Sequence, residues 1–335
     1  MKTPTYSLLL LLSIFLFSCS DIDKEEAARE RMKQENRLIV VCDYALQEPV
    51  SKMTRQFHIN HPEQNIEVQV KGSRRMAQQI ALGSLKADVF ISSDYRVIEN
   101  LLIPWYTQWY YVFAGDEMVI AYRPDSRLAD EINSENWYKI LLNDSVSFGR
   151  TDPDHAPVGY RAAICIKLSE NYYGEEGIKD HLLFKDKEHI EAEEKQVFEH
   201  LKKGDVDYIF TYKSEALQQK LKFVELPEQI NLKSPKWDSY YSREKVKVDA
   251  VTPGEYLERK GRAIRYAICK LSVGAQDSLA DIYLEYFARP DGGLKAVQDA
   301  SIPLIEQAYV APDSAAVEVK KMMGVSFSEN PKDSL

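Results

Sequence analysis

The sequence predicts an α/β protein of two lobes with a ligand cleft between them, and three observations support this. The chain has 335 residues, which is long for one hydrophobic core and suits two. Near its start, three segments in a row have the pattern strand, turn, helix. The same order returns later, around the proline-rich turn 151–161. Such units in series join parallel strands by right-handed crossovers, so we expect a mixed, mostly parallel sheet in each lobe.

The first lobe begins with a strand that the sequence marks clearly. Leu38–Cys42 is continuously apolar, as in a parallel strand covered on both faces. Pro49 then opens a helix that runs to about Asn60. The next elements are a strand at 66–70, a helix at 74–82 and a strand at 87–91. Because ligands in such sheets bind beyond the carboxyl ends of the strands, the turns 43–48, 71–74 and 92–95 are candidate contact sites.

The second lobe follows two short β runs, 109–113 and 118–122, which are separated by Ala114-Gly115-Asp116. This break predicts the crossing between the lobes. Gly204 predicts the end of a helix. The expected helices of this lobe span 159–173, 192–203 and 213–220, and its later strands span 207–212 and 222–226. The polar segment 227–253 carries a second crossing, after which a strand at 263–271 and helices at 277–287 and 292–300 return to the first lobe.

The turn 151–161 connects a short apolar-flanked run to a long helical pattern. A helix that begins at such a turn points its free N–H groups toward it, which suits a small anion. We therefore expect this turn to form one wall of an oxyanion site. Because a buried anion can be held by neutral dipoles, the net charge of −9 does not conflict with this expectation.

Composition and motifs exclude several functions. The acidic balance argues against a nucleic-acid partner, which requires a basic face. We expect no enzyme activity and no separate cofactor, because the sequence has no nucleophile elbow, zinc-protease motif, P-loop or dinucleotide fingerprint. Cys42, Cys165 and Cys269 lie in apolar runs without metal-ligand spacing, which predicts buried free thiols.

The N-terminus has the pattern of an export signal. A short basic start precedes an apolar run from Leu8 to Phe17, which is shorter than the roughly 20 residues that span a bilayer. The run ends at Leu16-Phe17-Ser18-Cys19, which resembles a bacterial lipoprotein box. We expect Cys19 to be the lipidated first residue of the mature chain, anchored to a membrane by acyl chains. A plain signal peptide cleaved elsewhere is the alternative.

These features divide the chain into regions with different expected roles. A charged segment without apolar period follows the signal and predicts a solvated tether. The expected divisions are a signal peptide at 1–18, a tether at 19–37, lobe I at 38–120 and about 245–325, lobe II at about 121–244, and a disordered tail at 326–335.

A series of short motifs carries a resemblance to a known family. They are Val70-Lys71-Gly72-Ser73, Ala87-Asp88-Val89 with Ser93-Asp94-Tyr95, Glu117 to Tyr122, Asn136-Trp137-Tyr138, Phe148 to Pro153, Pro157 to Arg161, and Gly204 to Tyr212. In order and spacing the chain resembles the periplasmic binding proteins of tungstate and molybdate importers, particularly the archaeal-type tungstate-binding branch. The likeness covers about 38 to 312, and the block from Gly149 to Arg161 is its most specific part.

The resemblance implies a type II binding-protein fold, a monomer that holds tungstate or molybdate between its lobes. Its implied partners are an ABC permease with its ATPase, and its implied location is the periplasm or cell surface. By position, the ligand-binding residues implied are Ala45, Ser73, Ala156, Pro157, Glu194 and Tyr212.

This sequence departs from that family pattern at two positions. Ala45 stands where a serine hydroxyl is expected, and Ala156 stands where an aspartate ligand is expected. The resemblance implies Glu194 as one carboxylate ligand to the metal of the oxyanion, and half of that carboxylate pair is missing unless Asp154 substitutes for it. A four-coordinate oxyanion held by hydrogen bonds and a six-coordinate metal both stay open. Binding of another small anion, or ligand sensing without transport, is the alternative function.

Overall fold

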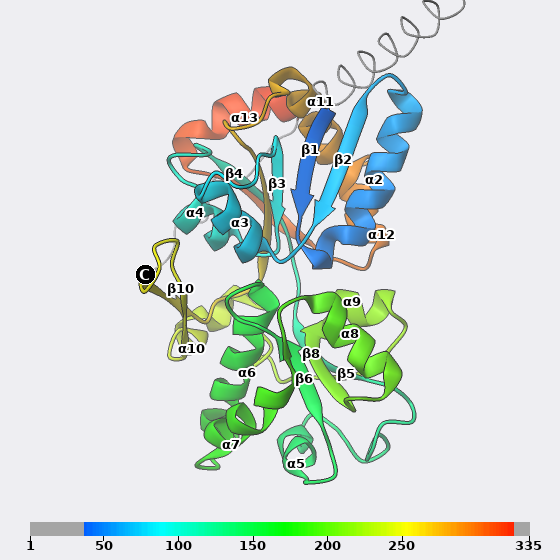
Figure 1. The fold of residues 1–335 in the computed structure, drawn as a ribbon, viewed down its shortest axis with the longest axis vertical. Helices are drawn as coiled ribbons and strands as arrows, with labels where there is room; N and C mark the ends of the chain where they lie inside the picture. Colours follow the sequence, from blue (N-terminus) through cyan, green and yellow to red (C-terminus); the bar gives the residue numbers. More distant parts are fainter. Residues whose placement is uncertain (1–36, 325–335) are drawn as a thin grey trace, which may run out of the picture.

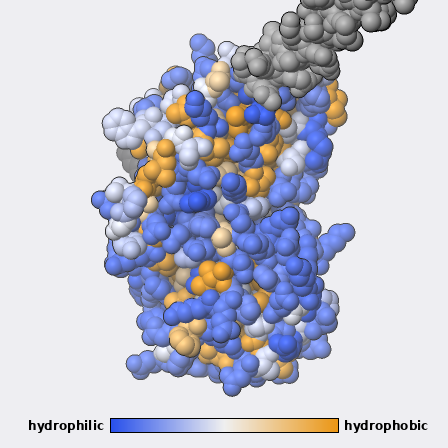
Figure 2. Space-filling view, in the orientation of Figure 1, coloured by the Kyte–Doolittle hydropathy of each residue, from blue (hydrophilic) through white to orange (hydrophobic). Residues whose placement is uncertain are grey.

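The computed structural model describes residues 37–324 and shows two lobes joined by a narrow waist (Figure 1). The expected signal peptide, Cys19, nearly all of the tether and the expected tail lie outside the described residues. Hydrophilic residues cover most of the face shown in Figure 2, with hydrophobic ones scattered among them. The apolar side chains gather mainly in clusters on the faces of the two sheets.

Lobe I is built on a six-stranded sheet in the order β13-β4-β12-β3-β1-β2. Only β1–β2 and β1–β3 pair in parallel, whereas β12 and β13 bring antiparallel pairs. The strands are β1 (Arg37–Cys42), β2 (Asn65–Val70), β3 (Val89–Ser92), β4 (Tyr110–Gly115), β12 (Arg265–Lys270) and β13 (Leu304–Ala311).

Helices cover both faces of this sheet, because neighbouring residues of a strand point to opposite sides. Val40 packs in the same cluster as Phe57 of α2, whereas Val41 packs in the cluster that contains Met76 of α3 and Val97 of α4. The helices of lobe I are α2 (Gln47–Asn60), α3 (Ser73–Ala81), α4 (Tyr95–Leu101), α11 (Asp277–Ala288), α12 (Gly293–Asp299) and α13 (Ala316–Met323).

Lobe II has a five-stranded sheet in the order β7-β6-β8-β5-β9. Its β6–β7 and β6–β8 pairs are parallel, and its β5–β8 and β5–β9 pairs are antiparallel. The strands are β5 (Met118–Tyr122), β6 (Phe148–Thr151), β7 (Ile190–Glu191), β8 (Tyr208–Tyr212) and β9 (Lys222–Glu225), and the helices are α5 (Trp137–Leu142), α6 (Pro157–Tyr173), α7 (Ile178–Lys185), α8 (Glu194–Lys203) and α9 (Lys213–Gln218).

The chain passes between the lobes where β4 ends and β5 begins. β4 belongs to the sheet of lobe I and β5 to that of lobe II, so the passage lies at Asp116-Glu117, a few residues before the expected boundary at 120. The return is more gradual. After β9, the helix α10 (Asp238–Tyr241) and a hairpin of β10 (Lys245–Asp249) and β11 (Tyr256–Lys260) precede β12.

The structure confirms the two-lobed α/β class and corrects three details. Antiparallel pairs equal or outnumber parallel ones in each sheet, so the expectation of mostly parallel sheets is wrong. The reason is that strands arriving from the other lobe, such as β12, enter against the direction of β3. The hairpin β10–β11 was not expected, because its polar, mostly exposed residues give no apolar run. The edge strand β13 was not expected, because Glu306 and Gln307 interrupt its apolar residues.

Candidate functional site

Two turns of lobe I converge on the carboxylate of Asp43, which follows β1. Ser73, the first residue of α3, donates to Asp43 Oδ2 through its backbone N–H at 2.7 Å and through its hydroxyl. The backbone N–H of Ala45 donates to Asp43 Oδ1 at 3.3 Å. Both Asp43 and Ser73 are fully buried. The turn after β3 lies beside them, since the N–H of Ser93 donates to the Ser73 hydroxyl at 3.3 Å.

Asp43 is therefore an anionic group inside a set of neutral donors. Burial raises the pKa of Asp43 above its ordinary value, while the hydrogen bonds from Ser73 lower it. Backbone bonds also hold this turn, because Asp43 N–H donates to Ile91 and its carbonyl accepts from Leu46. The donors of lobe I are thus arranged around one acceptor position.

Lobe II faces these turns with Arg161 and Tyr212. The Arg161 guanidinium donates to Tyr212 Oη at 2.6 Å and to the Ser93 carbonyl at 2.8 Å, and lies 3.5 Å from Asp94 Oδ2. Tyr160 also donates its hydroxyl to Asp94. Burial lowers the pKa of Arg161, but Tyr212 and Asp94 together raise it above its ordinary value. Arg161 therefore stays charged, and its bond to Tyr212 leaves the tyrosine proton available for another acceptor.

Two glutamates of lobe II form a buried carboxyl pair. Glu194 begins α8 and Glu215 lies in α9, where Thr211 donates to it at 2.8 Å. Burial raises the pKa of Glu194 well above its ordinary value, and the charge of Glu215 raises it further. Burial also raises the pKa of Glu215, to about 7. Both shifts favour the protonated form of this pair.

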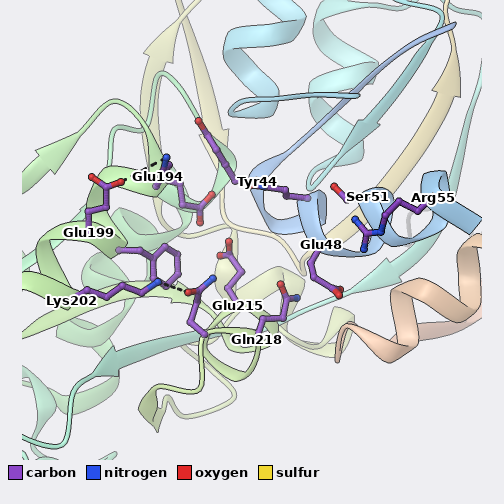
Figure 3. A pocket seen from close by; sticks show the side chains of 13 residues that line it. Tyr44, Glu48, Ser51, Arg55, Glu194, Glu199, Lys202, Glu215 and Gln218 are labelled. Carbon is purple, nitrogen blue, oxygen red and sulfur yellow. Dashed lines mark hydrogen bonds and ion pairs between the residues drawn. The ribbon is translucent and has the colours of Figure 1, made fainter. Parts of the chain in front are cut away.

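The carboxyl of Glu194 has only the carboxyl of Glu215 for company. Glu194 is 3% exposed, and within residues 37–324 neither of its carboxyl oxygens accepts a hydrogen bond from a fixed donor, so the two acids can bond only by sharing a proton. Glu194 and Glu215 point toward one another below Tyr44 (Figure 3). All three line a pocket of about 590 Å³, which lies between α2 on one side and α8 and α9 on the other. A buried carboxyl that lines a pocket and lacks a hydrogen-bond donor is a group that can meet a ligand.

Close contacts hold the two lobes together around this site. The N–H of Arg75 donates to the His155 carbonyl at 3.1 Å, and a Cβ placed on Gly72 would lie 2.4 Å from the same oxygen. The buried Arg74 donates to the carbonyl of Asp249 at 2.5 Å. On the other side of the cleft, Tyr44 donates its hydroxyl to Glu193 at 2.6 Å. The structure is therefore a closed arrangement of the lobes.

The residues implied by the resemblance fall into two groups. Ala45, Ser73, Glu194 and Tyr212 are all buried. Hydrogen bonds through Arg161 and Ser93 connect Tyr212 to Ser73 and Asp43. Ala156 and Pro157 instead form the start of α6 at the contact between lobes, where Ala156 Cβ lies 2.8 Å from a Cβ built on Gly72.

The structure also shows what Asp154 and the Ser73 hydroxyl contact. Asp154 accepts from the backbone N–H of Asp249 at 2.5 Å, so in this arrangement it fastens the β10 hairpin. Ser73 does not cap α3 with its side chain, because Gly72 is the cap residue and the hydroxyl bonds Asp43.

Sequence reasoning missed Asp43 and Glu215. Asp43 lies in the turn 43–48, which the sequence predicts to contact ligand. The sequence gives no reason to single it out there, because an acid is unexpected among donors to an oxyanion. Glu215 lies in a helix pattern with no motif, and only the fold brings it to Glu194.

Other features of the described residues bear on the chemistry. Cys42, Cys165 and Cys269 are buried free thiols, as expected. Across residues 37–324 there is no group of three or more His, Cys, Asp or Glu side chains arranged to hold a metal ion. The same part of the chain contains no helix with the length and apolar character needed to cross a membrane.

Comparison with known proteins shows the family of this chain. Residues 38–293 match the family model for bacterial extracellular solute-binding proteins. An uncharacterised solute-binding protein of Petrotoga mobilis is 40% identical over 232 residues, covering 69% of this chain and 72% of its own length. The molybdate/tungstate-binding protein WtpA of Thermococcus kodakarensis is 31% identical over 311 residues, covering 84% of this chain and 86% of its own length.

Solved structures confirm the fold. The periplasmic molybdate-binding protein of Azotobacter vinelandii superposes with a TM-score of 0.56 at 16% identity, covering 80% of this chain and all of its own. The sulfate-binding protein SubI of Mycobacterium tuberculosis superposes with a TM-score of 0.55 at 12% identity, covering 87% and 92%. The architecture is thus that of the type II periplasmic binding proteins. With its match over most of its length, the chain belongs to the family of bacterial extracellular solute-binding proteins.

Proposed function

We propose that this chain captures a tungstate or molybdate oxyanion between its lobes and delivers it to an ABC permease. The observation that carries this proposal is the convergence of Ser73 N–H, Ser73 Oγ and Ala45 N–H on one anionic acceptor. A tetrahedral dianion offers only acceptor oxygens, so it needs such donors. A relative that is 31% identical is named for binding molybdate and tungstate.

Lobe II supplies the other half of the proposed contact. Tyr212 accepts from Arg161 and keeps its own proton for an oxyanion oxygen. Protonated Glu194 has an O–H to donate, which removes the repulsion that a carboxylate would impose on a dianion. Arg161 is engaged by Asp94 and Tyr212, so it acts through the tyrosine rather than by direct charge. Neutral donors hold an anion while allowing its release, because each contributes only about 1 kcal/mol net.

Glu194 has a second role that the same site allows. As a carboxylate it would ligate the metal and expand its coordination, which is the role that the resemblance to the tungstate-binding branch implies. Such coordination needs a second carboxylate, but Ala156 stands where it is expected, and Asp154 is hydrogen-bonded to Asp249. We therefore favour a four-coordinate oxyanion with Glu194 as a hydrogen-bond donor.

The N-terminal sequence and the resemblance support a cellular location for the protein and a route for its ligand. We propose that lipidated Cys19 holds the chain at a membrane surface outside the cytoplasm, and that the monomer meets its permease there. Uptake of molybdenum and tungsten by cells lacking this gene tests delivery. Loss of uptake supports transport, whereas normal uptake favours a binding protein that only senses its ligand.

Calorimetry of the purified protein, produced with Cys19→Ser, tests ligand capture. Molybdate and tungstate should release or absorb heat with one site per chain, and sulfate and phosphate serve as comparison anions. If sulfate or phosphate binds more tightly, another small anion is the ligand. If none of the four gives heat or raises the melting temperature, the ligand assignment is wrong. Glu194→Gln, which keeps a donor, should bind nearly as well if the oxyanion is four-coordinate and should lose binding if Glu194 ligates the metal.

A further inference from the structure

Asp43 occupies the position where the proposed oxyanion would be held. Its Oδ2 takes both donors of Ser73 and its Oδ1 takes the N–H of Ala45. A carboxylate and an oxyanion oxygen are equivalent to such donors, since both present lone pairs and negative charge. The donors that should bind ligand in lobe I are therefore already satisfied by the chain itself.

Turn formation alone does not account for this arrangement. An aspartate commonly accepts a hydrogen bond from the N–H two residues later, and the bond from Ala45 is of this kind. Such a turn needs only one carboxylate oxygen. The second oxygen of Asp43 reaches Ser73, which lies 30 positions away in another turn.

The surroundings of Asp43 make a second anion costly there. The charge of Asp43 raises the pKa of both Glu194 and Glu215 in lobe II, so it is Asp43 that carries negative charge here. Arg161 does not offset this charge directly, because it is engaged by Asp94 and Tyr212. An oxyanion entering beside an ionised Asp43 would meet like charge in a buried site, where screening is weak.

We propose that Asp43 is an internal occupant of the oxyanion subsite of lobe I and that a ligand must displace it, which makes Asp43 a determinant of affinity and specificity. This inference rests on the proposed function. It predicts that Asp43 keeps its hydrogen bonds to Ser73 and Ala45 until a ligand replaces it. It also predicts that anions with stronger or more acceptor oxygens than a carboxylate are selected.

Removing the carboxylate tests the proposal. Asp43→Ala frees the donors of Ser73 and Ala45, and Asp43→Asn keeps the shape while removing the charge. With molybdate and tungstate as probes in calorimetry, we expect Asp43→Ala to bind at least about tenfold more tightly than the wild type, with Asp43→Asn between them. Asp88→Asn is the matched control. Asp88 is also buried in lobe I, but it precedes β3 and so lies at the opposite end of the strands from Asp43. The control should leave affinity unchanged.

Each outcome has a distinct meaning. Equal affinity of the wild type and both variants would show that Asp43 only shapes its turn, and the inference would be wrong while the proposed function stands. Weaker binding by both variants would show that Asp43 helps to hold the ligand, and this result would also overturn the inference. Absence of binding by every protein, with melting curves showing folded chains, would reject the proposed function itself. If Asp43→Ala does not fold, the comparison of Asp43→Asn with the wild type decides.

Discussion

The carboxylate of Asp43 accepts hydrogen bonds from both the backbone N–H and the hydroxyl of Ser73, which follows it by 30 positions. This pair joins the turn after β1 to the start of α3 inside lobe I. It shows that these turns are arranged around an anion, and that in the closed arrangement the anion is the protein's own side chain.

Tyr212→Phe should weaken oxyanion binding. The substitution removes the only proton that Tyr212 Oη offers a ligand, a loss of about 1–2 kcal/mol, or roughly 5- to 30-fold in affinity. Calorimetry with molybdate measures it. Tyr208→Phe is a suitable control, because Tyr208 begins the same strand but its hydroxyl bonds the Arg127 carbonyl at 2.5 Å. Equal affinities for Tyr212→Phe and the control would remove Tyr212 from the site.

Gly72→Ala should prevent full closure of the lobes. The added Cβ would lie 2.4 Å from the His155 carbonyl and 2.8 Å from Ala156 Cβ. Overpacking of this kind costs about 1–3 kcal/mol, which corresponds to roughly 5- to 150-fold weaker binding. Small-angle scattering should show a larger radius of gyration than the wild type has.

Gly83→Ala provides the comparison for this effect. Gly83 has φ +69° and no atom within 4 Å of an added Cβ, so the substitution strains the backbone without touching the other lobe. It should lower stability while scattering and affinity stay unchanged. An unchanged radius for Gly72→Ala would mean that this contact does not limit closure.

The free energy of unfolding should fall as pH rises from about 4.5 to about 7. Burial raises the pKa of Glu215 from 4.5 to about 7. The folded chain then keeps a proton that the unfolded chain has released, so stability is greatest below the window and levels off above it. Asp116, whose pKa burial raises to about 6, acts in the same direction.

Denaturant unfolding at several pH values measures this dependence. Glu215→Gln should flatten it, because the amide does not titrate and still accepts from Thr211. The half-exposed Glu199 gives a control, since Glu199→Gln should leave the slope as it is. Stability that rises with pH across this window in the wild type would contradict the ionisation state inferred for the pair.

The three described cysteines should not react with a thiol reagent while the protein is folded. Cys42, Cys165 and Cys269 are fully buried, and burial raises the pKa of each thiol, so almost no thiolate is available. In the Cys19→Ser protein, colour should develop only after denaturant is added and then reach three thiols per chain. Rapid labelling without denaturant would indicate that a lobe opens locally.

Local patterns in the sequence determined most elements of this fold. The apolar run at 38–42 became β1 because a strand covered on both faces needs apolar residues at every position. Gly204 ends α8 with φ +87°, the left-handed conformation that glycine adopts without strain. Pro157 opens α6 where its fixed φ suits the first helical turn. These features depend on neighbouring residues, so they are readable from the chain.

The resemblance also named Ser73, Glu194 and Tyr212, and the structure buries all three side chains, while their contact with a ligand stays a prediction. Only the tertiary structure decided what these residues contact. The order of strands brings Asp43 to Ser73, and the packing of α8 and α9 brings Glu194 to Glu215. Such contacts join residues far apart in the chain, and the burial that raises the pKa of the carboxyls exists only once the lobes have folded. For that reason the sequence determined the elements and the candidate turns, whereas the fold decided that the carboxylate of Asp43 accepts the hydrogen bonds of Ser73 and Ala45.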